Sequence, residues 1–417
     1  MKIKEMDDIS FSEALERALE NAPEIVRTEM VSVSSALGRI VAEDIYCRKN
    51  LPSFDNSAMD GFAVMCADAG KRVKVAGEIY AGDKPELSSL SKGECYRIMT
   101  GAPVPSGVES VVPVERCLDL SEDEVTLPVK VGCGDNIRKK GEEIERGSTL
   151  IEAGERLEFP HIAMLSAQGI TTVKVVASPR IAVVSTGNEI REPWESAEED
   201  EIYNANALGI TALLESEGFD AVYAGSIPDD LEASVSFIAN LKSYDVIIST
   251  GGISMGEADF LEEAYRLNGM REPLFHGVSV KPGRPTMMGL MDNTFVMAMP
   301  GNPLTTMLNI FLLSVPVLYR MQGARGYHYP FVTVENRESF GYKSFRANIV
   351  PGRIENGGFC AVRRNKIGSG MISPLMEADC VAIFEKGFEA PEVGDKIKVV
   401  MFSSKPSLEK EMWINRV

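Results

Sequence analysis

The sequence predicts a multidomain α/β plus β protein: a central parallel α/β domain in three layers, an inserted β-rich domain, a small helical N-terminal region and a closing β-domain. Apolar runs alternate with helical patterns over residues 178–321, which is typical of a parallel sheet covered on both faces. Short strand patterns separated by Gly, Pro and Asp fill residues 45–145 and return after residue 326. The 417 residues suit roughly two to four domains.

The N-terminal region is expected to hold two helices around the β-rich stretch. Ser10 stands three residues before Glu13, which is a capping-box pattern, and apolar residues follow at helical spacing. A second helix is expected over residues 159–168, ending before Gly169. The expected boundaries are 1–44 with 145–170 for the small region and 45–144 for the insert.

The central domain is expected to contain four strands, each followed by a helix. The strands are expected at Ile181–Val184, Ala221–Ala224, Val246–Ile248 and Phe295–Ala298. The helices are expected at Ala207–Glu217, Leu231–Leu241, Phe260–Leu267 and Leu304–Met321. The last helix is the most apolar stretch, and Asn309 and Pro316 interrupt it, so we expect a buried core helix rather than a membrane span.

Charge, cysteine usage and the N-terminus favour a cytoplasmic protein. A net charge of −18 repels nucleic acid and anionic membranes, so we expect neither as a partner. Seven cysteines are an odd number and no CxxC pair occurs, which favours reduced thiols over a disulfide framework. The first residues lack the apolar core of a signal peptide.

Small and polar residues follow all four predicted strands, where parallel sheets bind ligands. The loop after the third strand begins Thr250-Gly251-Gly252 and contains Ser254, and it can offer N–H groups and a hydroxyl to a phosphate. A tight strand-to-helix turn explains the same glycines. The loops are residues 185–189, 226–230, 249–259 and 300–303.

Carboxylates gather at the same edge, which suggests a magnesium ion between them and a phosphate. They are Glu189, Asp229, Asp230, Glu257 and Asp259. Helix capping explains any one of these acids equally well, and Asn302 before Pro303 is likewise a strong helix start.

Basic residues follow in Val280-Lys281-Pro282-Gly283-Arg284-Pro285, where two prolines stiffen the loop. Fixed cations bind oxyanions well because little entropy remains to be lost. A stray pair of surface cations is the alternative.

In the insert, residues 52–64 form a polar loop that is longer than a turn needs, and residues 99–103 are similar.

These segments together resemble the molybdopterin molybdenumtransferases, the MoeA family, which includes the gephyrin E-domain. The matching segments are PSFDNSAMDGFAV (52–64), RIMTGAPVP (97–105), NIRKKGEEI (136–144), VVSTGNEI (183–190), STGGISMGEADF (249–260), VKPGRP (280–285) and MPGNP (299–303). They occur in the family's order and cover nearly the whole chain.

The resemblance implies an elongated homodimer whose active cleft lies at the dimer interface, facing the insert of the partner. Residues 171–325 would be the molybdopterin-binding α/β domain, and residues 326–417 a C-terminal β-barrel. The implied reaction joins molybdate or tungstate to adenylyl-molybdopterin, forms molybdenum cofactor and releases AMP, with Mg²⁺ as the cation. The adenylyltransferase and cofactor-accepting apoenzymes are the implied protein partners.

The resemblance also implies roles for individual residues. The catalytic set would be Asp60, Thr100, Glu143, Glu189, Asp229, Asp259 and Lys281. The pterin substrate would contact Thr250, Gly251, Gly252, Ser254, Pro300, Gly301 and Asn302. Molybdate would contact Lys281, Arg284, Arg346 and Ser369, and the metal would contact Asp229, Asp259 and Glu189.

Three positions depart from the family's pattern. Glu143 stands where many relatives have aspartate, and Arg284 stands where many have lysine, whose ammonium is not equivalent to a planar guanidinium. Gly277 stands where some bacterial members have a further lysine.

Two other functions compete with molybdate insertion. A non-catalytic pterin carrier or scaffold is the first, although the chain keeps Asp60, Asp259 and Lys281. Adenylyl transfer to molybdopterin is the second, although stand-alone adenylyltransferases resemble only the α/β domain.

Overall fold

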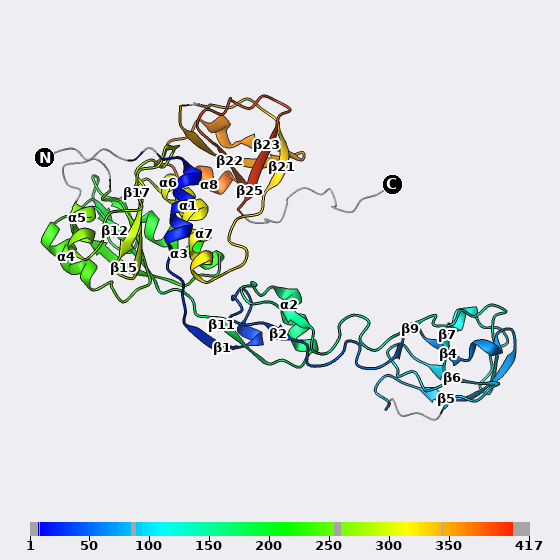
Figure 1. The fold of residues 1–417 in the computed structure, drawn as a ribbon. Coiled ribbons are helices and arrows are strands. Elements are labelled where there is room, and N and C mark those ends of the chain that lie inside the picture. Colours follow the sequence, from blue (N-terminus) through cyan, green and yellow to red (C-terminus); the bar gives the residue numbers. More distant parts are fainter. Residues whose placement is uncertain (1–6, 8, 85–88, 254–259, 344, 403–417) are drawn as a thin grey trace.

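The computed structural model describes residues 7, 9–84, 89–253, 260–343 and 345–402. The chain is elongated (Figure 1). The α/β domain and the C-terminal domain lie together at one end, the small region lies in the middle, and the insert lies at the other end.

The α/β domain is built on a mixed sheet with the strand order β15-β12-β16-β20-β19-β17. The four predicted strands are confirmed, and they are parallel. Two further strands, which pair antiparallel to their neighbours, extend one edge of the sheet. They were not predicted, because the run MMGLM lacks the β-branched residues that mark a strand. The strands are β12 (Ile181–Thr186), β15 (Ala221–Ile227), β16 (Val246–Thr250), β20 (Thr294–Met299), β19 (Met287–Met291) and β17 (Phe275–His276).

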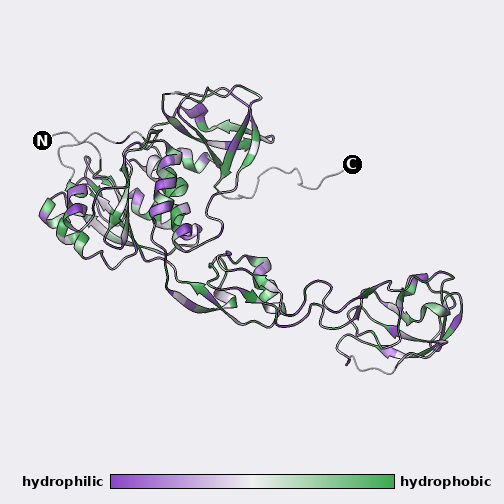
Figure 2. Ribbon diagram, viewed as in Figure 1, coloured by the Kyte–Doolittle hydropathy of each residue, from purple (hydrophilic) through white to green (hydrophobic). Residues whose placement is uncertain are grey.

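Helices cover both faces of this sheet, as the three-layer prediction requires. Alternate side chains of β12 point to opposite cores: Val183 packs with α3 and α6, whereas Val184 packs with α4 and α5. Figure 2 shows the hydrophobic colouring along these strands and on the helices beside them. The helices are α3 (Ala205–Ser216), α4 (Leu231–Ala239), α5 (Phe260–Leu267), α6 (Pro303–Asn309) and α7 (Val315–Met321).

Helices α6 and α7 run on through a π-helical turn, Ile310–Ser314. Together they form the one helix of the described chain that is long and apolar enough to cross a membrane, and it is 89% buried inside the protein. It is therefore a core helix, as predicted.

The first helix, α1 (Phe11–Asn21), begins as predicted, because the Ser10 hydroxyl accepts a hydrogen bond from the Glu13 N–H at 3.1 Å. Its position differs from the expectation that it belongs to the small region. Phe11 and Ala18 join the core around α7, so α1 packs on the α/β domain. The apolar stripe of the helix specifies burial but not the partner.

The small region contains sheet as well as helix. Strands β1 (Thr28–Ser32) and β11 (Thr172–Val176) pair, as do β2 (Ile45–Tyr46) and β10 (Thr149–Ile151). Helix α2 (Phe159–Ala167) lies beside them (Figure 1). A small core that includes Leu157 and Leu165 joins the three.

The insert is β-rich, as predicted, with a five-stranded sheet in the order β7-β4-β6-β5-β8. Its first and last strands pair with each other, so the chain enters and leaves the insert at one place. The strands are β3 (Asn56–Ser57), β4 (Gly61–Val64), β5 (Arg72–Ile79), β6 (Glu94–Ile98), β7 (Ser110–Pro113), β8 (Glu124–Thr126) and β9 (Ile137–Arg138).

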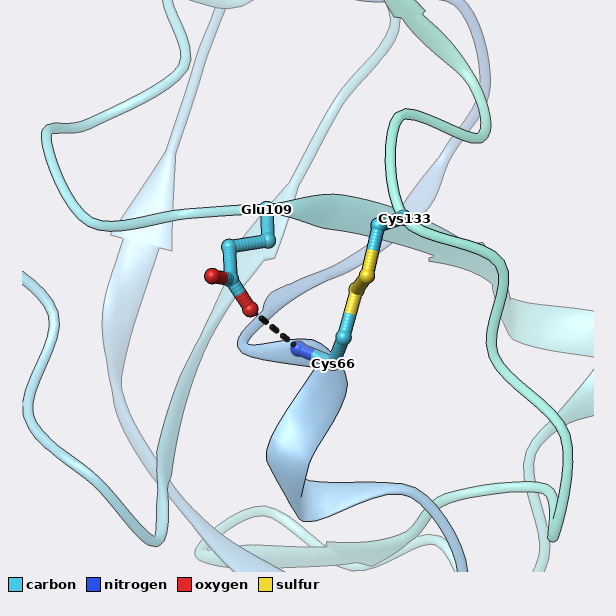
Figure 3. A group of neighbouring side chains, drawn as sticks. All are labelled: Cys66, Glu109 and Cys133. Atoms are coloured by element: carbon cyan, nitrogen blue, oxygen red, sulfur yellow. Dashed lines mark hydrogen bonds between the residues drawn. A yellow bond between two sulfur atoms is a disulfide. The ribbon is translucent and has the colours of Figure 1, made fainter.

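The expectation that all thiols are reduced is wrong for one pair, because Cys66 and Cys133 form a disulfide in the insert. Figure 3 shows it beside Glu109, whose carboxylate accepts a hydrogen bond from the Cys66 N–H at 2.9 Å. The two cysteines are 67 residues apart, and only the tertiary fold brings them together, so cysteine spacing could not reveal the pair.

The C-terminal domain is a closed five-stranded barrel, which confirms the implied fold. Its strands follow the order β22-β23-β21-β25-β24, and β24 pairs back with β22. A strand of the α/β domain, β18 (Val280–Lys281), adds in parallel to β22. The barrel comprises β21 (Val332–Asn336), β22 (Ala347–Glu355), β23 (Gly358–Ala361), β24 (Cys380–Phe384), β25 (Lys396–Met401) and helix α8 (Ser373–Glu377).

Candidate active site

The loops that follow β16 and β20 are tied together by a buried hydrogen-bond network. Thr250 is 1% exposed, and its hydroxyl donates to the Pro300 carbonyl at 3.1 Å. Asn206, at the start of α3, donates to the Thr250 hydroxyl at 2.8 Å and to the Gly301 carbonyl at 2.7 Å. Thr250, Pro300 and Gly301, three of the residues that the resemblance implies for pterin binding, thus lie together. Asn206 was not predicted.

Gly251 allows the loop after β16 to approach the end of β12 closely. It adopts φ +89°, and a Cβ there would lie 2.6 Å from the Thr186 hydroxyl. Its N–H donates to the Met299 carbonyl at 3.0 Å, so this particular donor stabilises the turn. Gly252, at φ +66°, likewise lies against Thr186. The tight strand-to-helix turn therefore explains these glycines, whether or not they also bind a ligand. Ser254 lies outside the described residues.

The acidic residues separate into a helix cap and two exposed carboxylates. Asp230 caps α4 by accepting from the Ala233 N–H at 2.8 Å. Asp229 accepts from the Asn188 N–H at 3.1 Å, which joins the loops after β12 and β15. Glu189 curls back over Gly187 in the same region. Glu257 and Asp259, the remaining acids of this edge, lie outside the described residues.

The predicted oxyanion residues line one cavity of about 560 Å³ between the α/β domain and the barrel. Lys281 and Arg284 come from the VKPGRP loop, and Arg346 and Ser369 come from the barrel. Asn302 lines the cavity too, and its amide donates to the Ser369 hydroxyl at 3.0 Å. Asn302 occupies the N-cap position of α6 but makes no side-chain cap bond, so its amide is used between the domains instead.

A buried asparagine of α6, Asn309, anchors the VKPGRP loop through hydrogen bonds. Asn309 is fully buried on α6 and donates to the Thr286 hydroxyl at 2.7 Å. That hydroxyl donates in turn to the Gly283 carbonyl at 2.8 Å. Asn309 therefore anchors the segment between Lys281 and Arg284 to the core.

The cations of the cavity influence each other. Burial lowers the pKa of the Lys281 ammonium below its ordinary value, and the positive charges of Lys343 and Arg346 lower it further. Lys343 lines the cavity but was not predicted. An anion between these groups would relieve their repulsion.

The insert holds a separate cluster of predicted residues. Asp60 accepts hydrogen bonds from the N–H and the hydroxyl of Thr100, each at 2.7 Å, and these bonds hold the pKa of its carboxyl below the ordinary value. Asp55 nearby binds the Lys139 ammonium at 2.9 Å. Glu143 is exposed, and its N–H donates to the Leu51 carbonyl at 3.1 Å.

The structure does not bring these insert residues to the cavity within one chain. Asp60 directly precedes β4 and Thr100 follows β6, and both strands lie at the far end of the molecule from the α/β domain (Figure 1). The predicted site is therefore divided into two halves on a single chain.

Comparisons with known proteins agree with this architecture. Three family profiles match in order: the MoeA N-terminal region (domain I and II) at residues 9–169, a probable molybdopterin binding domain at 182–320, and the MoeA C-terminal region (domain IV) at 333–402. A molybdopterin molybdenumtransferase of Haemophilus influenzae is 30% identical over 414 residues, which cover 95% of this chain and 99% of that protein. This chain belongs to the MoeA family.

Other MoeA relatives support the same assignment. A molybdopterin molybdenumtransferase of Staphylococcus epidermidis is 28% identical over 422 residues and covers 99% of this chain. Two solved MoeA structures from Pyrococcus horikoshii have TM-scores of 0.77 and 0.82 at 30% and 26% identity. They cover 96% and 95% of this chain and all of their own chains. The resemblance in sequence and the full-length fold thus agree.

Proposed function

We propose that this MoeA-family chain inserts molybdate or tungstate into adenylyl-molybdopterin, forms molybdenum cofactor and releases AMP. The observation that carries the proposal is the cavity beside the strand-end loops. It is lined by Lys281, Arg284 and Arg346 in a protein whose net charge is −18. A concentrated positive site within a negative surface suits a small dianion.

The chain's residues take the following roles in this proposal. The pterin nucleotide binds against the sheet edge, where it contacts residues 250–252, Ser254 and residues 300–302. The hydrogen bonds of Thr250 fix the conformation of the two loops that carry residues 250 and 300. The cations and Ser369 orient the oxyanion and offset charge that develops on the departing AMP.

Mg²⁺ fits the acids of the sheet edge. Asp229 and Glu189 are exposed carboxylates on neighbouring loops, and hard cations prefer carboxylate oxygens together with phosphate oxygens. Asp259 completes the proposed set. The ion would supply neutralisation of the pyrophosphate charge.

We further propose that the working unit is a homodimer in the cytoplasm. Asp60 and Thr100 adjoin β4 and β6, which lie far from the α/β domain of their own chain, so a second copy would have to present its insert, with Glu143, to complete the site. The adenylyltransferase that supplies the nucleotide and the apoenzymes that accept the cofactor are the expected transient partners.

The test is AMP release by purified protein given adenylyl-molybdopterin, Mg²⁺ and molybdate. The expected result is molybdate-dependent AMP release, matched by cofactor that reconstitutes an apoenzyme. Tight binding of the adenylate without molybdate-stimulated release would instead indicate a pterin carrier. Consumption of ATP with no bound adenylate would indicate adenylyl transfer.

A further inference from the structure

The oxyanion cavity contains one more cation than the family motifs supply. Lys343 lines it together with Lys281, Arg284 and Arg346. Among the described residues that line the cavity, none is Asp or Glu. Like charges at close range raise the free energy of the empty site, and a bound anion removes that cost. The cavity is therefore charged beyond what the motif residues alone would provide.

The segment that carries Lys343 and Arg346 is clasped by one buried side chain. Asn348 is 3% exposed, and its amide donates to the Lys343 carbonyl at 2.8 Å and to the Arg346 carbonyl at 2.9 Å. Both cations lie over the ring of Phe345, whose centroid is 6.0 Å from the Lys343 ammonium and 5.6 Å from the Arg346 guanidinium. Both ends of the segment are thus held by the same amide.

Asn348 is also tied to the third cation through the backbone. Strands β18 and β22 are parallel, and Lys281 is the direct partner of Asn348 in their register. A single position therefore fixes the spacing of Lys281, Lys343 and Arg346, although they come from two domains. Because Asn348 is buried and its amide is occupied by two backbone carbonyls, its own role is to position rather than to react.

We propose that Lys343 binds the oxyanion directly and that Asn348 is the positioning residue that aims Lys343 and Arg346 at it. The proposal rests on the proposed function, since it deepens the assignment of this cavity to a tetrahedral dianion. Four cations from two domains can surround such an ion, and each removes part of its charge. The fourth donor makes Lys343 a determinant of oxyanion affinity rather than of pterin binding.

The first test is calorimetric titration of the full-length protein with molybdate and with tungstate. Lys343→Met keeps the aliphatic stem and removes the charge, so the Kd should rise about tenfold, as for one lost charge-assisted hydrogen bond. Lys366→Met is the matched control, because Lys366 is exposed and lies between two cavity-lining residues, Asn365 and Ile367, but does not line the cavity itself. Binding by Lys343→Met that equals binding by the control overturns the direct contact.

The second test separates positioning from stability. Asn348→Leu is nearly isosteric and removes both donors, and it should weaken oxyanion binding while adenylate binding stays unchanged. Asn336→Leu is the control, because Asn336 is a buried barrel asparagine that donates to two carbonyls, Pro391 and Glu392, away from the cavity. Both variants should lower Tm similarly, but only Asn348→Leu should change the Kd. Equal Kd values in the two variants overturn the positioning role.

These readouts distinguish failure of the inference from failure of the proposed function. Suppose that the wild type binds molybdate but releases no AMP, and that Lys343→Met binds molybdate more weakly. This result would support the inference and contradict the insertion reaction. Undiminished binding in Lys343→Met, with normal AMP release by the wild type, would sink the inference alone.

Discussion

Lys281 shows how much of the site a motif can specify at the scale of single residues. The stiff VKPGRP loop predicts a fixed cation, and the structure places it on the cavity with Arg284, Arg346 and Ser369. Its lowered pKa could not be predicted from that loop, because burial in the folded protein lowers it and because Lys343, which lowers it further, lies 62 positions later in the sequence. Buried asparagines such as Asn206 and Asn348 were missed for a related reason. A buried amide carries no periodic signal, and its partners are known only after folding.

The lowered pKa of Lys281 predicts a pH dependence for oxyanion binding. The anion binds the charged ammonium, and a lysine with a lowered pKa loses its charge at a lower pH than an ordinary lysine. Affinity for tungstate should therefore fall on the alkaline side earlier than a normal lysine would allow. Lys343→Met removes a neighbouring positive charge, so it should raise the pKa of Lys281 and move that fall to higher pH. Titrations over a pH series would measure both midpoints, and coincident midpoints would contradict the coupling.

Thr100 predicts a second pH effect, in the insert. Thr100→Val removes the hydroxyl bond to Asp60 and keeps the backbone bond, so the pKa of Asp60 should rise toward its ordinary value. If catalysis needs the carboxylate, the acid limb of the AMP-release profile should shift to higher pH. Thr126→Val is the control, because its hydroxyl donates to Asp119 elsewhere in the insert. A profile that moves equally in both variants would argue against a role for Asp60.

At the scale of elements, periodicity predicts what lies inside a sheet better than what lies at its edge. The four parallel strands were predicted because they are continuous apolar runs, which burial on both faces requires for the inner strands β12, β16 and β20. Strands β19 and β17 were not, since one is rich in Met and Gly and the other has two residues. Convergence of the strand-end loops follows from parallel topology and was predicted. The cross-links that hold those loops, from Asn206 on α3, were not.

Asn206→Leu tests the importance of that cross-link. The substitution removes the buried hydrogen bond to the Thr250 hydroxyl and the bond to the Gly301 carbonyl, and each lost hydrogen bond costs about 0.5–1.5 kcal/mol of unfolding free energy. Urea unfolding should show a loss in this range, and adenylate affinity should fall because the loops after β16 and β20 lose their link. Asn240→Leu, at an exposed asparagine that follows α4, should change neither quantity. Unchanged adenylate affinity in Asn206→Leu would mean that the loops hold their shape without it.

At the scale of the whole molecule, the sequence pattern predicts an inserted domain but not how far it lies from the α/β domain. The switch from helical to alternating patterns locates the β-rich domain, and pairing of β3 with β9 shows why entry and exit coincide. Nothing in a local pattern says that this lobe stands apart from the α/β domain (Figure 1). The division of the predicted site between two lobes is visible only in the fold, and it leads to the proposal of a dimer.

Mixing two inactive variants tests whether the site is shared between chains. Asp60→Asn disables the insert, and Lys281→Met disables the cavity. In a mixed dimer, one site would combine the intact insert of one chain with the intact cavity of the other, so AMP release should reappear after the chains are exchanged. Each variant alone supplies the control. Mixtures that remain inactive, although size-exclusion and mass measurements show mixed dimers, would place the whole site on one chain.

Strand β18 has a consequence for how this protein can be divided. By sequence it belongs to the α/β domain, yet its partner strand is β22 of the barrel. A fragment that stops at residue 325 would keep Lys281 and lose the neighbour that lines up its backbone, leaving a bare strand edge open to stray pairing. The oxyanion cavity is thus formed by two domains together, and neither domain alone would retain it.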